Sequence, residues 1–212
     1  MLTGYAKFEK RFIFNKDSII LPAPVSKYFL DNMGVDFHAT SINNFSEFKS
    51  PYLLFSGRLI KEKRIDLLLD LYLKYGSFLP RLIIAGDGPE YNSFKHIINE
   101  QNLNIVMLGR VSDLEMIFLM KNASIFITLE WADFNLTVYE ALTLGTRVIF
   151  GMFYNVEFHD FKYIQEKKLF YVCPDVEEIF CTINNVLEIG DSSDADMKYT
   201  WDDTINIFLN KI

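Results

Sequence analysis

The sequence has little cysteine and no long apolar run. Only Cys173 and Cys181 occur in 212 residues, which is too few for a disulfide framework, so a reducing, cytoplasmic location is expected. The apolar runs, such as residues 52–56, have the length of a strand and fall far short of the roughly 20 residues that cross a bilayer. Charged residues at positions 7–11 leave no apolar core for a signal peptide. We therefore expect neither a transmembrane helix nor a secretory leader.

Basic residues and histidines are also scarce. Lysine and arginine number 21 against 28 acidic residues, which gives a formal net charge of -7 at pH 7. Nucleic acid is not an expected partner, because binding to its phosphate backbone needs a basic face. The three histidines, His38, His96 and His159, lack a second histidine or cysteine at metal-ligand spacing. Neither a metal site nor a Ser-His-Asp arrangement is predicted.

Half of the residues are hydrophobic, and they follow a regular pattern. Short apolar runs alternate with longer stretches of helical periodicity, which is typical of a parallel sheet wrapped by helices. The predicted strands are residues 52–56, 81–85, 104–108, 124–129, 146–150 and 169–172. Helices are expected from apolar spacing within residues 65–72, 91–98 and 114–121, and over residues 137–144, 177–187 and 201–212.

The predicted strands are apolar on both faces, so helices should cover both sides of the sheet. This pattern predicts a doubly wound, Rossmann-like α/β domain, whose ligands bind beyond the carboxyl ends of the strands. Residues 51–200 form the expected core domain. Residues 1–50 are interpreted as a linker or inter-domain segment, and residues 201–212 as a closing helix.

Two cations follow the first predicted strand, in 57-GRLIKEKRID-66. Gly57 permits close approach of the backbone, and Arg58 and Lys63 suit a diphosphate, the first through its planar fork and the second as a point charge. The alternative is that these basic side chains are merely solvated. The stretch after the second strand, 85-AGDGPE-90, is interpreted as a turn that leads into a helix.

The third predicted strand ends in 107-MLGRVSD-113. Ser112 or Asp113 is placed to cap the next helix. Gly109 and Arg110 lie at the expected sheet edge, where the backbone could line a pocket for a base.

The fourth predicted strand runs into 129-LEWADFNLTVYEALTLG-145. The turn at residues 133–137 precedes a helix, and the unpaired N–H groups of a helix start can cradle a phosphate. Glu140, one turn inside, could accept hydrogen bonds from ribose hydroxyls. Alternatively, Glu140 is an ordinary first-turn glutamate that the helix dipole favours.

Five stretches in order resemble the retaining GT-B glycosyltransferases of family 4, also called glycosyl transferases group 1. They are 55-FSGRLIKEKRIDLLL-69, 82-LIIAGDGPE-90, 104-NIVMLGRVSD-113, 136-LTVYEALTLGTRVI-149 and 201-WDDTINIFL-209. The resemblance covers roughly residues 52–212 and implies that the chain is one half of a GT-B fold, the half that holds a nucleotide-diphosphate sugar.

The resemblance also implies roles for individual residues. Arg58 and Lys63 match the pair that contacts the donor diphosphate and stabilises the leaving group, and they are the implied catalytic residues. Glu140 matches the glutamate that binds the ribose. The implied donor-binding residues are Gly57, Arg58, Lys63, Gly109, Arg110, Val111, Phe134, Asn135, Leu136, Thr137 and Glu140.

One position departs from the family pattern. The family places a further glutamate, near the donor sugar, eight residues before the one at Glu140, and here that position is Ala132. Glu130 lies ten residues before and Asp133 seven before. Either of these carboxylates replaces the missing one as a sugar contact, or the protein manages without it.

The function implied is hexosyltransferase-like: transfer of a sugar, with retention, from a UDP-sugar or GDP-sugar to an acceptor glycan, lipid or protein. No metal or other cofactor is expected, because cations and a helix dipole serve the leaving group. Family enzymes are about twice as long, and 19-IILPAPVSKYF-29 resembles their inter-domain crossing. We therefore expect residues 1–50 to include a remnant of the N-terminal half, and that half or a partner chain to complete the enzyme. The resemblance leaves open an association with a membrane surface.

The sequence leaves two other functions to consider. A non-catalytic module that binds nucleotide sugars or a partner chain fits the short length and Ala132. An NAD-dependent oxidoreductase shares the fold class, but no G-x-G-x-x-G follows the first predicted strand.

Overall fold

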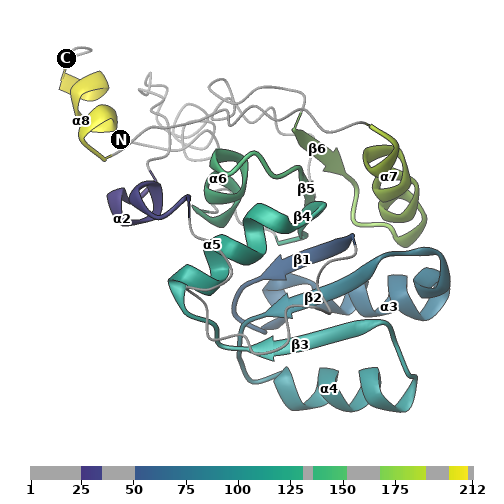
Figure 1. Cartoon of the computed structure of the whole chain (residues 1–212). Coiled ribbons are helices and arrows are strands. Elements are labelled where there is room, and N and C mark those ends of the chain that lie inside the picture. The colour runs from purple at the N-terminus through teal and green to yellow at the C-terminus, as the bar shows by residue number, and fades with distance from the viewer. Residues whose placement is uncertain (1–24, 35–50, 131–135, 152–167, 190–200, 210–212) are drawn as a thin grey trace, which may run out of the picture.

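The computed structural model describes residues 25–34, 51–130, 136–151, 168–189 and 201–209. Within these ranges the chain forms a six-stranded sheet in the order β3-β2-β1-β4-β5-β6, and every neighbouring pair is parallel (Figure 1). The strands are β1 (Tyr52–Ser56), β2 (Arg81–Ala85), β3 (Ile105–Gly109), β4 (Ile125–Thr128), β5 (Val148–Gly151) and β6 (Leu169–Val172). The predicted strands are confirmed, with ends that differ by at most two residues.

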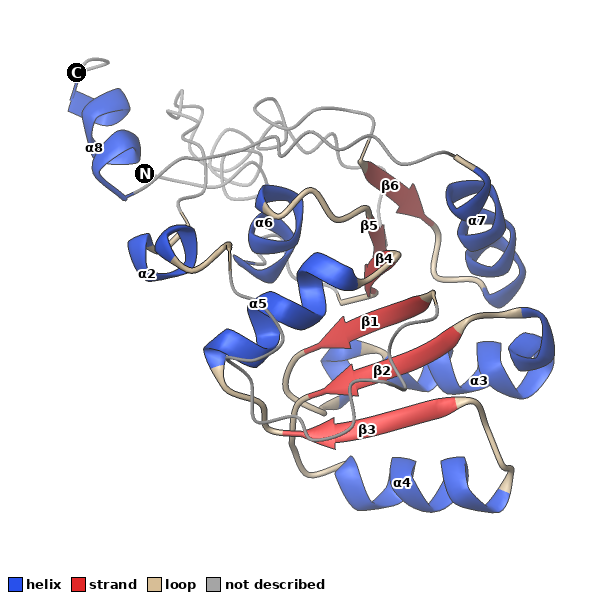
Figure 2. Ribbon diagram, in the orientation of Figure 1, coloured by secondary structure: helices blue, strands red, loops and turns tan. Residues whose placement is uncertain are grey.

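Helices cover both faces of the sheet (Figure 2). One apolar cluster joins the sheet to α3 (Ile65–Tyr75), α4 (Tyr91–Glu100) and α7 (Val176–Glu188). The other joins it to α2 (Lys27–Asp31), α5 (Asp113–Asn122) and α6 (Leu136–Thr143). The remaining elements are α8 (Trp201–Leu209) and the short 3-10 helices η3 (Lys61–Lys63) and η4 (Gly76–Phe78).

Strand β1 shows why the sheet is buried on both sides. Leu53 and Phe55 belong to the cluster with α3, whereas Tyr52 and Leu54 belong to the cluster with α5. All four side chains are at most 2% exposed. Successive residues of a strand point to opposite faces, so a run without polar residues fills two cores at once. The predicted doubly wound, Rossmann-like class is confirmed.

Helix α5 begins where the sequence predicts a cap. The Ser112 hydroxyl accepts a hydrogen bond from the Glu115 N–H at 3.3 Å, and the Glu115 carboxylate accepts one from the Ser112 N–H at 2.7 Å. This reciprocal pair satisfies two donors that a helix start leaves open. The cap fixes the direction in which the chain leaves the β3 loop.

Helix α2 lies in the segment interpreted as a linker. Its N-cap is Ser26, whose hydroxyl accepts a hydrogen bond from the Phe29 N–H at 3.2 Å. Val25 and Phe29 are buried in the cluster with α5 and α6. The segment at residues 25–34 therefore packs on the core domain. The rest of this segment, residues 1–24 and 35–50, lies outside the described residues.

Strand order reverses direction between β1 and β4. Successive strands add on one side through β1, β2 and β3, and on the other side through β4, β5 and β6. In doubly wound sheets, ligands bind outside the carboxyl ends of the strands at such a reversal. None of the helices in the described ranges has the length and hydropathy required to cross a membrane.

Candidate functional site

The loops that follow β1, β2 and β3 are joined by backbone hydrogen bonds. The Gly57 N–H donates to the Ala85 carbonyl at 3.1 Å, and the Gly86 N–H donates to the Gly109 carbonyl at 2.7 Å. One step further along, the Leu59 N–H donates to the Asp87 carbonyl at 3.0 Å. The parallel ladder thus continues past the strand ends and holds the three loops side by side.

Glycine is required where these loops touch. A Cβ atom at Gly86 would lie 1.9 Å from the Gly57 carbonyl oxygen, and one at Gly88 would lie 2.4 Å from the Leu59 carbonyl oxygen. The obstacle in each case is backbone, which cannot swing aside as a flexible side chain would. The sequence predicts only a turn before a helix at residues 86–88. In the structure, Gly86 and Gly88 also allow the loop after β2 to pack against the loop after β1.

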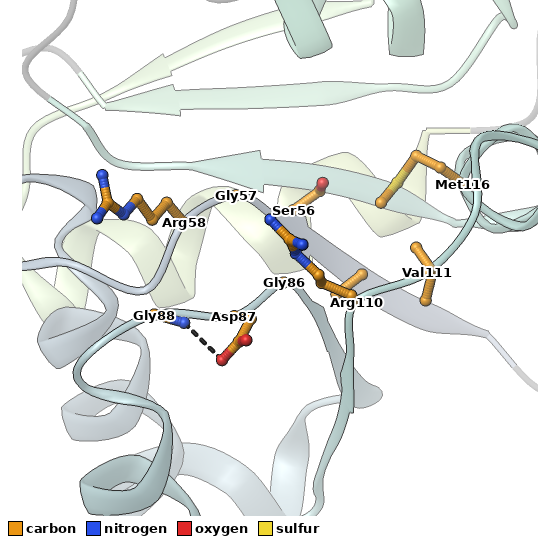
Figure 3. Close-up of a pocket in the computed structure, with 10 residues that line it drawn as sticks. Ser56, Gly57, Arg58, Gly86, Asp87, Gly88, Arg110, Val111 and Met116 are labelled. Carbon is orange, nitrogen blue, oxygen red and sulfur yellow. Dashed lines mark hydrogen bonds between the residues drawn. The ribbon is translucent and has the colours of Figure 1, made fainter.

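A pocket of about 570 Å³ opens at the carboxyl ends of β1, β2 and β3 (Figure 3). It brings together four of the residues that the sequence implicates: Gly57, Arg58, Arg110 and Val111. The walls that sequence reasoning missed come from Ser56, Ala85, Gly86, Asp87, Gly88 and Met116.

The charges of this pocket are mainly cationic. Figure 3 shows the Arg110 guanidinium pointing across the pocket toward Ser56, while the Arg58 side chain extends to the other side. Both arginines are exposed. The Asp87 carboxylate accepts a hydrogen bond from the Gly88 N–H at 2.7 Å, so part of its charge is satisfied by the loop itself. Two planar cations at one strand edge suit a ligand with anionic oxygens.

Lys63 lies next to this pocket and pairs with Glu130. A Cβ atom added to Gly57 would meet the Lys63 Cε at 3.7 Å, so the lysine stem runs beside the pocket wall. Its ammonium donates a hydrogen bond to the Glu130 carboxylate. Glu130 is only 4% exposed, against 24% for Lys63. The two residues implicated separately by sequence, one for the diphosphate and one for the sugar, are thus bonded to each other.

Glu140 lies in α6 and is half-buried. Burial and, to a smaller extent, the negative charge of Asp113 together raise the pKa of its carboxyl from 4.5 to about 7. Asp113 is the first residue of α5, directly after the cap that follows the β3 loop. The Glu140 carboxyl is therefore within electrostatic reach of the start of α5, which follows the loop of Arg110 and Val111.

The structure describes only some of the other predicted site residues. Gly109 ends β3 with φ 70°, a left-handed conformation that favours glycine. Leu136 and Thr137 open α6, the first exposed and the second half-buried. Ala132, Asp133, Phe134 and Asn135 lie outside the described residues. Across the part of the chain that the structure describes, no group of three acidic, histidine or cysteine side chains could hold a metal ion.

Comparison with protein families shows which family the chain belongs to. A model described as "Glycosyl transferases group 1" matches residues 39–200. The chain belongs to this family. No curated protein matches the chain.

Solved structures of glycosyltransferases share the architecture. A glycosyltransferase from Rickettsia africae ESF-5 has a TM-score of 0.77 at 16% identity, over 99% of this chain and 61% of its own. The lipopolysaccharide outer core galactosyltransferase WaaB has a TM-score of 0.67 at 19% identity, over 97% of this chain and 59% of its own. WaaG, a glycosyltransferase involved in lipopolysaccharide biosynthesis, has a TM-score of 0.63 at 15% identity, over 89% and 53%.

At such low identities these likenesses show the fold. The group 1 chain described here is one Rossmann-like half of a GT-B architecture, as its sequence predicts. It spans about three fifths or less of the length of these three structures.

Proposed function

We propose that this chain is the donor-binding half of a glycosyltransferase that transfers a sugar from a nucleotide-diphosphate sugar to an acceptor. Membership of the group 1 family supports glycosyl transfer in general. The observation that carries the proposal is the pocket at the carboxyl ends of β1, β2 and β3, where Arg58 and Arg110 meet backbone from three glycine-containing loops. The donor is a UDP-sugar or a GDP-sugar.

The donor has a proposed orientation in this pocket. Its diphosphate lies near Arg58 and Lys63, which flank Gly57, and its base lies against the loop of Gly109, Arg110 and Val111. The ribose hydroxyls donate to the Glu140 carboxylate. Burial of that carboxyl supports the assignment, because a desolvated carboxylate gains more from two hydroxyl donors than a hydrated one. The start of α6 contributes its positive dipole end to the phosphates.

Catalysis in this proposal is mostly electrostatic. The bond between the anomeric carbon and the diphosphate oxygen breaks, and its electron pair leaves with the nucleoside diphosphate. Arg58, Lys63 and the α6 start stabilise that charge as it develops. The acceptor hydroxyl oxygen bonds to the anomeric carbon, and its proton passes to the departing diphosphate oxygen. Family resemblance supports transfer on the face that the leaving group vacates, which retains the configuration.

The acceptor is a glycan, lipid or protein hydroxyl, and its site is proposed to lie on a second GT-B half or a partner chain. The greater length of the three similar structures supports this division. The low cysteine content supports a reducing compartment such as the cytoplasm.

One observation favours a second function. Ala132 stands where the family has a carboxylate near the donor sugar, and its methyl group cannot accept a hydrogen bond from a sugar hydroxyl. A module that binds the nucleotide sugar without turning it over fits this substitution.

Calorimetric titration with UDP, GDP, UDP-glucose and GDP-mannose tests both functions. The proposal predicts binding of one nucleotide series with Kd between about 1 μM and 1 mM, as is usual for enzyme substrates. Absence of binding by all four ligands at millimolar concentration would contradict it. Release of the nucleoside diphosphate from the bound donor, unchanged by EDTA, separates the enzyme from the non-catalytic module.

A further inference from the structure

Glu130 is a buried carboxylate at the carboxyl edge of the sheet. It follows β4 by two positions and is 4% exposed. An ionised carboxylate is costly to remove from water unless a charge partner and hydrogen bonds compensate for the lost hydration. The Lys63 ammonium supplies a charge partner. The cost of burying Glu130 therefore depends on where the Lys63 side chain is held.

The ion pair crosses the boundary at which strand order reverses. Lys63 ends η3 in the segment after β1, whereas Glu130 follows β4, the neighbour of β1 on the other side. Leu53 pairs with Ile125 and Leu54 with Phe126 along that boundary. The pair thus places an ammonium group at the position where doubly wound sheets hold the phosphates of their ligands.

The two cations proposed for the diphosphate differ in how they are held. Arg58 is exposed, and its side chain extends away from Arg110 at the pocket rim (Figure 3). Lys63 is half-buried, runs beside Gly57 and ends on a buried carboxylate. A lysine loses side-chain entropy when it is fixed in one conformation. The bond to Glu130 fixes it before any ligand arrives.

We propose that Glu130 is a positioning residue for Lys63 and does not contact the donor sugar. This inference rests on the proposed function, because Lys63 is assigned there to the diphosphate. The carboxylate holds the ammonium beside the pocket, so that the donor meets an oriented charge. With Glu130 engaged by Lys63, Asp133 is the remaining candidate for the carboxylate that the family has at the position of Ala132.

A double-mutant cycle separates positioning from direct contact. The variants are Glu130→Gln, Lys63→Met and their combination, each titrated with UDP and with UDP-glucose, or with GDP and GDP-mannose if guanine is the base. Gln keeps the shape of Glu130 without its charge, and Met keeps most of the lysine stem. We expect Glu130→Gln to weaken binding of the nucleoside diphosphate about tenfold when Lys63 is present. With Lys63→Met the same change should have less than about a twofold effect.

The sugar provides the second readout. A positioning role predicts that Glu130→Gln changes the affinities for UDP and UDP-glucose by the same factor. A loss confined to UDP-glucose, or an equal loss in both lysine backgrounds, would assign Glu130 to the ligand and overturn the proposal. Unchanged or tighter binding of UDP by Glu130→Gln would overturn it as well.

A second variant serves as a control for misfolding. Glu130→Asp keeps the charge on a shorter arm, so it should weaken UDP binding by a smaller factor and again only when Lys63 is present. A loss of affinity with Glu130→Asp that is independent of Lys63 contradicts the positioning role. If the unchanged chain binds neither UDP nor GDP, the proposed function itself is overturned. If it binds normally but the effect of Glu130→Gln does not depend on Lys63, only the role of Glu130 is overturned.

Discussion

The carbonyl oxygen of Gly57 occupies the space in which a side chain at position 86 would begin. A Cβ atom on Gly86 would lie 1.9 Å from that oxygen, and the backbone of Gly86 has φ 150°. The contact joins the loops after β1 and β2, and both glycines line the pocket. Any other residue at position 86 has to push these loops apart.

Gly86→Ala should therefore destabilise the protein and disturb the pocket together. We expect the free energy of unfolding to fall by about 2 kcal/mol or more, because the obstacle is backbone and the conformation is strained for alanine. Urea denaturation measures the change. Gly34→Ala is a matched control, since a Cβ atom there meets nothing within 4 Å. Equal stability of the two variants would show that the loops are not packed as described.

Arg58→Ala should separate binding from folding. The side chain is exposed at the pocket rim, so its removal opens no cavity in the core. We expect the affinity for the nucleoside diphosphate to fall about tenfold or more, and the melting temperature to stay within about 2 °C. Lys61→Ala, an exposed cation that does not line this pocket, is the control. Similar losses of affinity for both variants would show that Arg58 acts only through the overall positive charge of the surface and does not contact the ligand.

Lys63→Met should behave differently from Arg58→Ala. It leaves the Glu130 carboxylate buried without this cation, and we expect a loss of about 2 kcal/mol in the free energy of unfolding. Adding Glu130→Gln should restore much of that stability, because the amide carries no charge to compensate. Chemical denaturation of the three variants measures the coupling. Additive losses would indicate that the two side chains act independently.

The Glu140 carboxyl should make donor binding depend on pH. Burial raises its pKa to about 7, and the ionised form is the better acceptor for ribose hydroxyls. We expect the affinity for UDP-glucose to rise between pH 6 and pH 8. The diphosphate of UDP-glucose is esterified at both ends and has no proton that titrates in that range. Glu140→Gln should bind more weakly at pH 8 and show a flat profile, and an unchanged slope would assign the titration to another group.

The same carboxyl should lower stability as pH rises. Its pKa is about 7 in the folded chain against an ordinary value of 4.5, so the folded state binds the proton more tightly. The favourable contribution of this carboxyl to the free energy of unfolding is full below about pH 4.5 and is lost as pH rises through about 7. Glu140→Gln should therefore gain stability over the unchanged protein between pH 5 and pH 8. Thermal denaturation across this range measures the difference, and a constant gap would contradict the raised pKa.

The fold was predictable from the sequence because its strands are short apolar runs with polar boundaries. Strand β1 and strand β2 begin and end where the pattern predicts, and Ser112, one of the two expected caps, is the N-cap of α5. Helix α2 was not predicted, because five residues carry too little periodicity. The burial of Val25 and Phe29 in the structure shows that the segment packs on the domain.

The candidate site was predictable in part. Arg58 and Arg110 follow strands, and parallel strands bring their carboxyl ends to one edge, so their meeting follows from topology. The pairing of Lys63 with Glu130 joins residues 67 positions apart, and no local pattern carries that information. The sequence likewise shows Gly86 only as part of a local turn. The carbonyl of Gly57, which makes glycine necessary at position 86, belongs to another loop.

The most direct test of the donor-binding pocket is a titration of the ¹⁵N-labelled chain with UDP and GDP, followed by NMR through its glycine amides. We expect one of the two nucleotides to shift the amides of Gly57, Gly86 and Gly88. The amide of Gly145, which lines a pocket at the opposite edge of the sheet, should stay unchanged. Shifts confined to Gly145 and its neighbours, or none with either nucleotide at millimolar concentration, would contradict it.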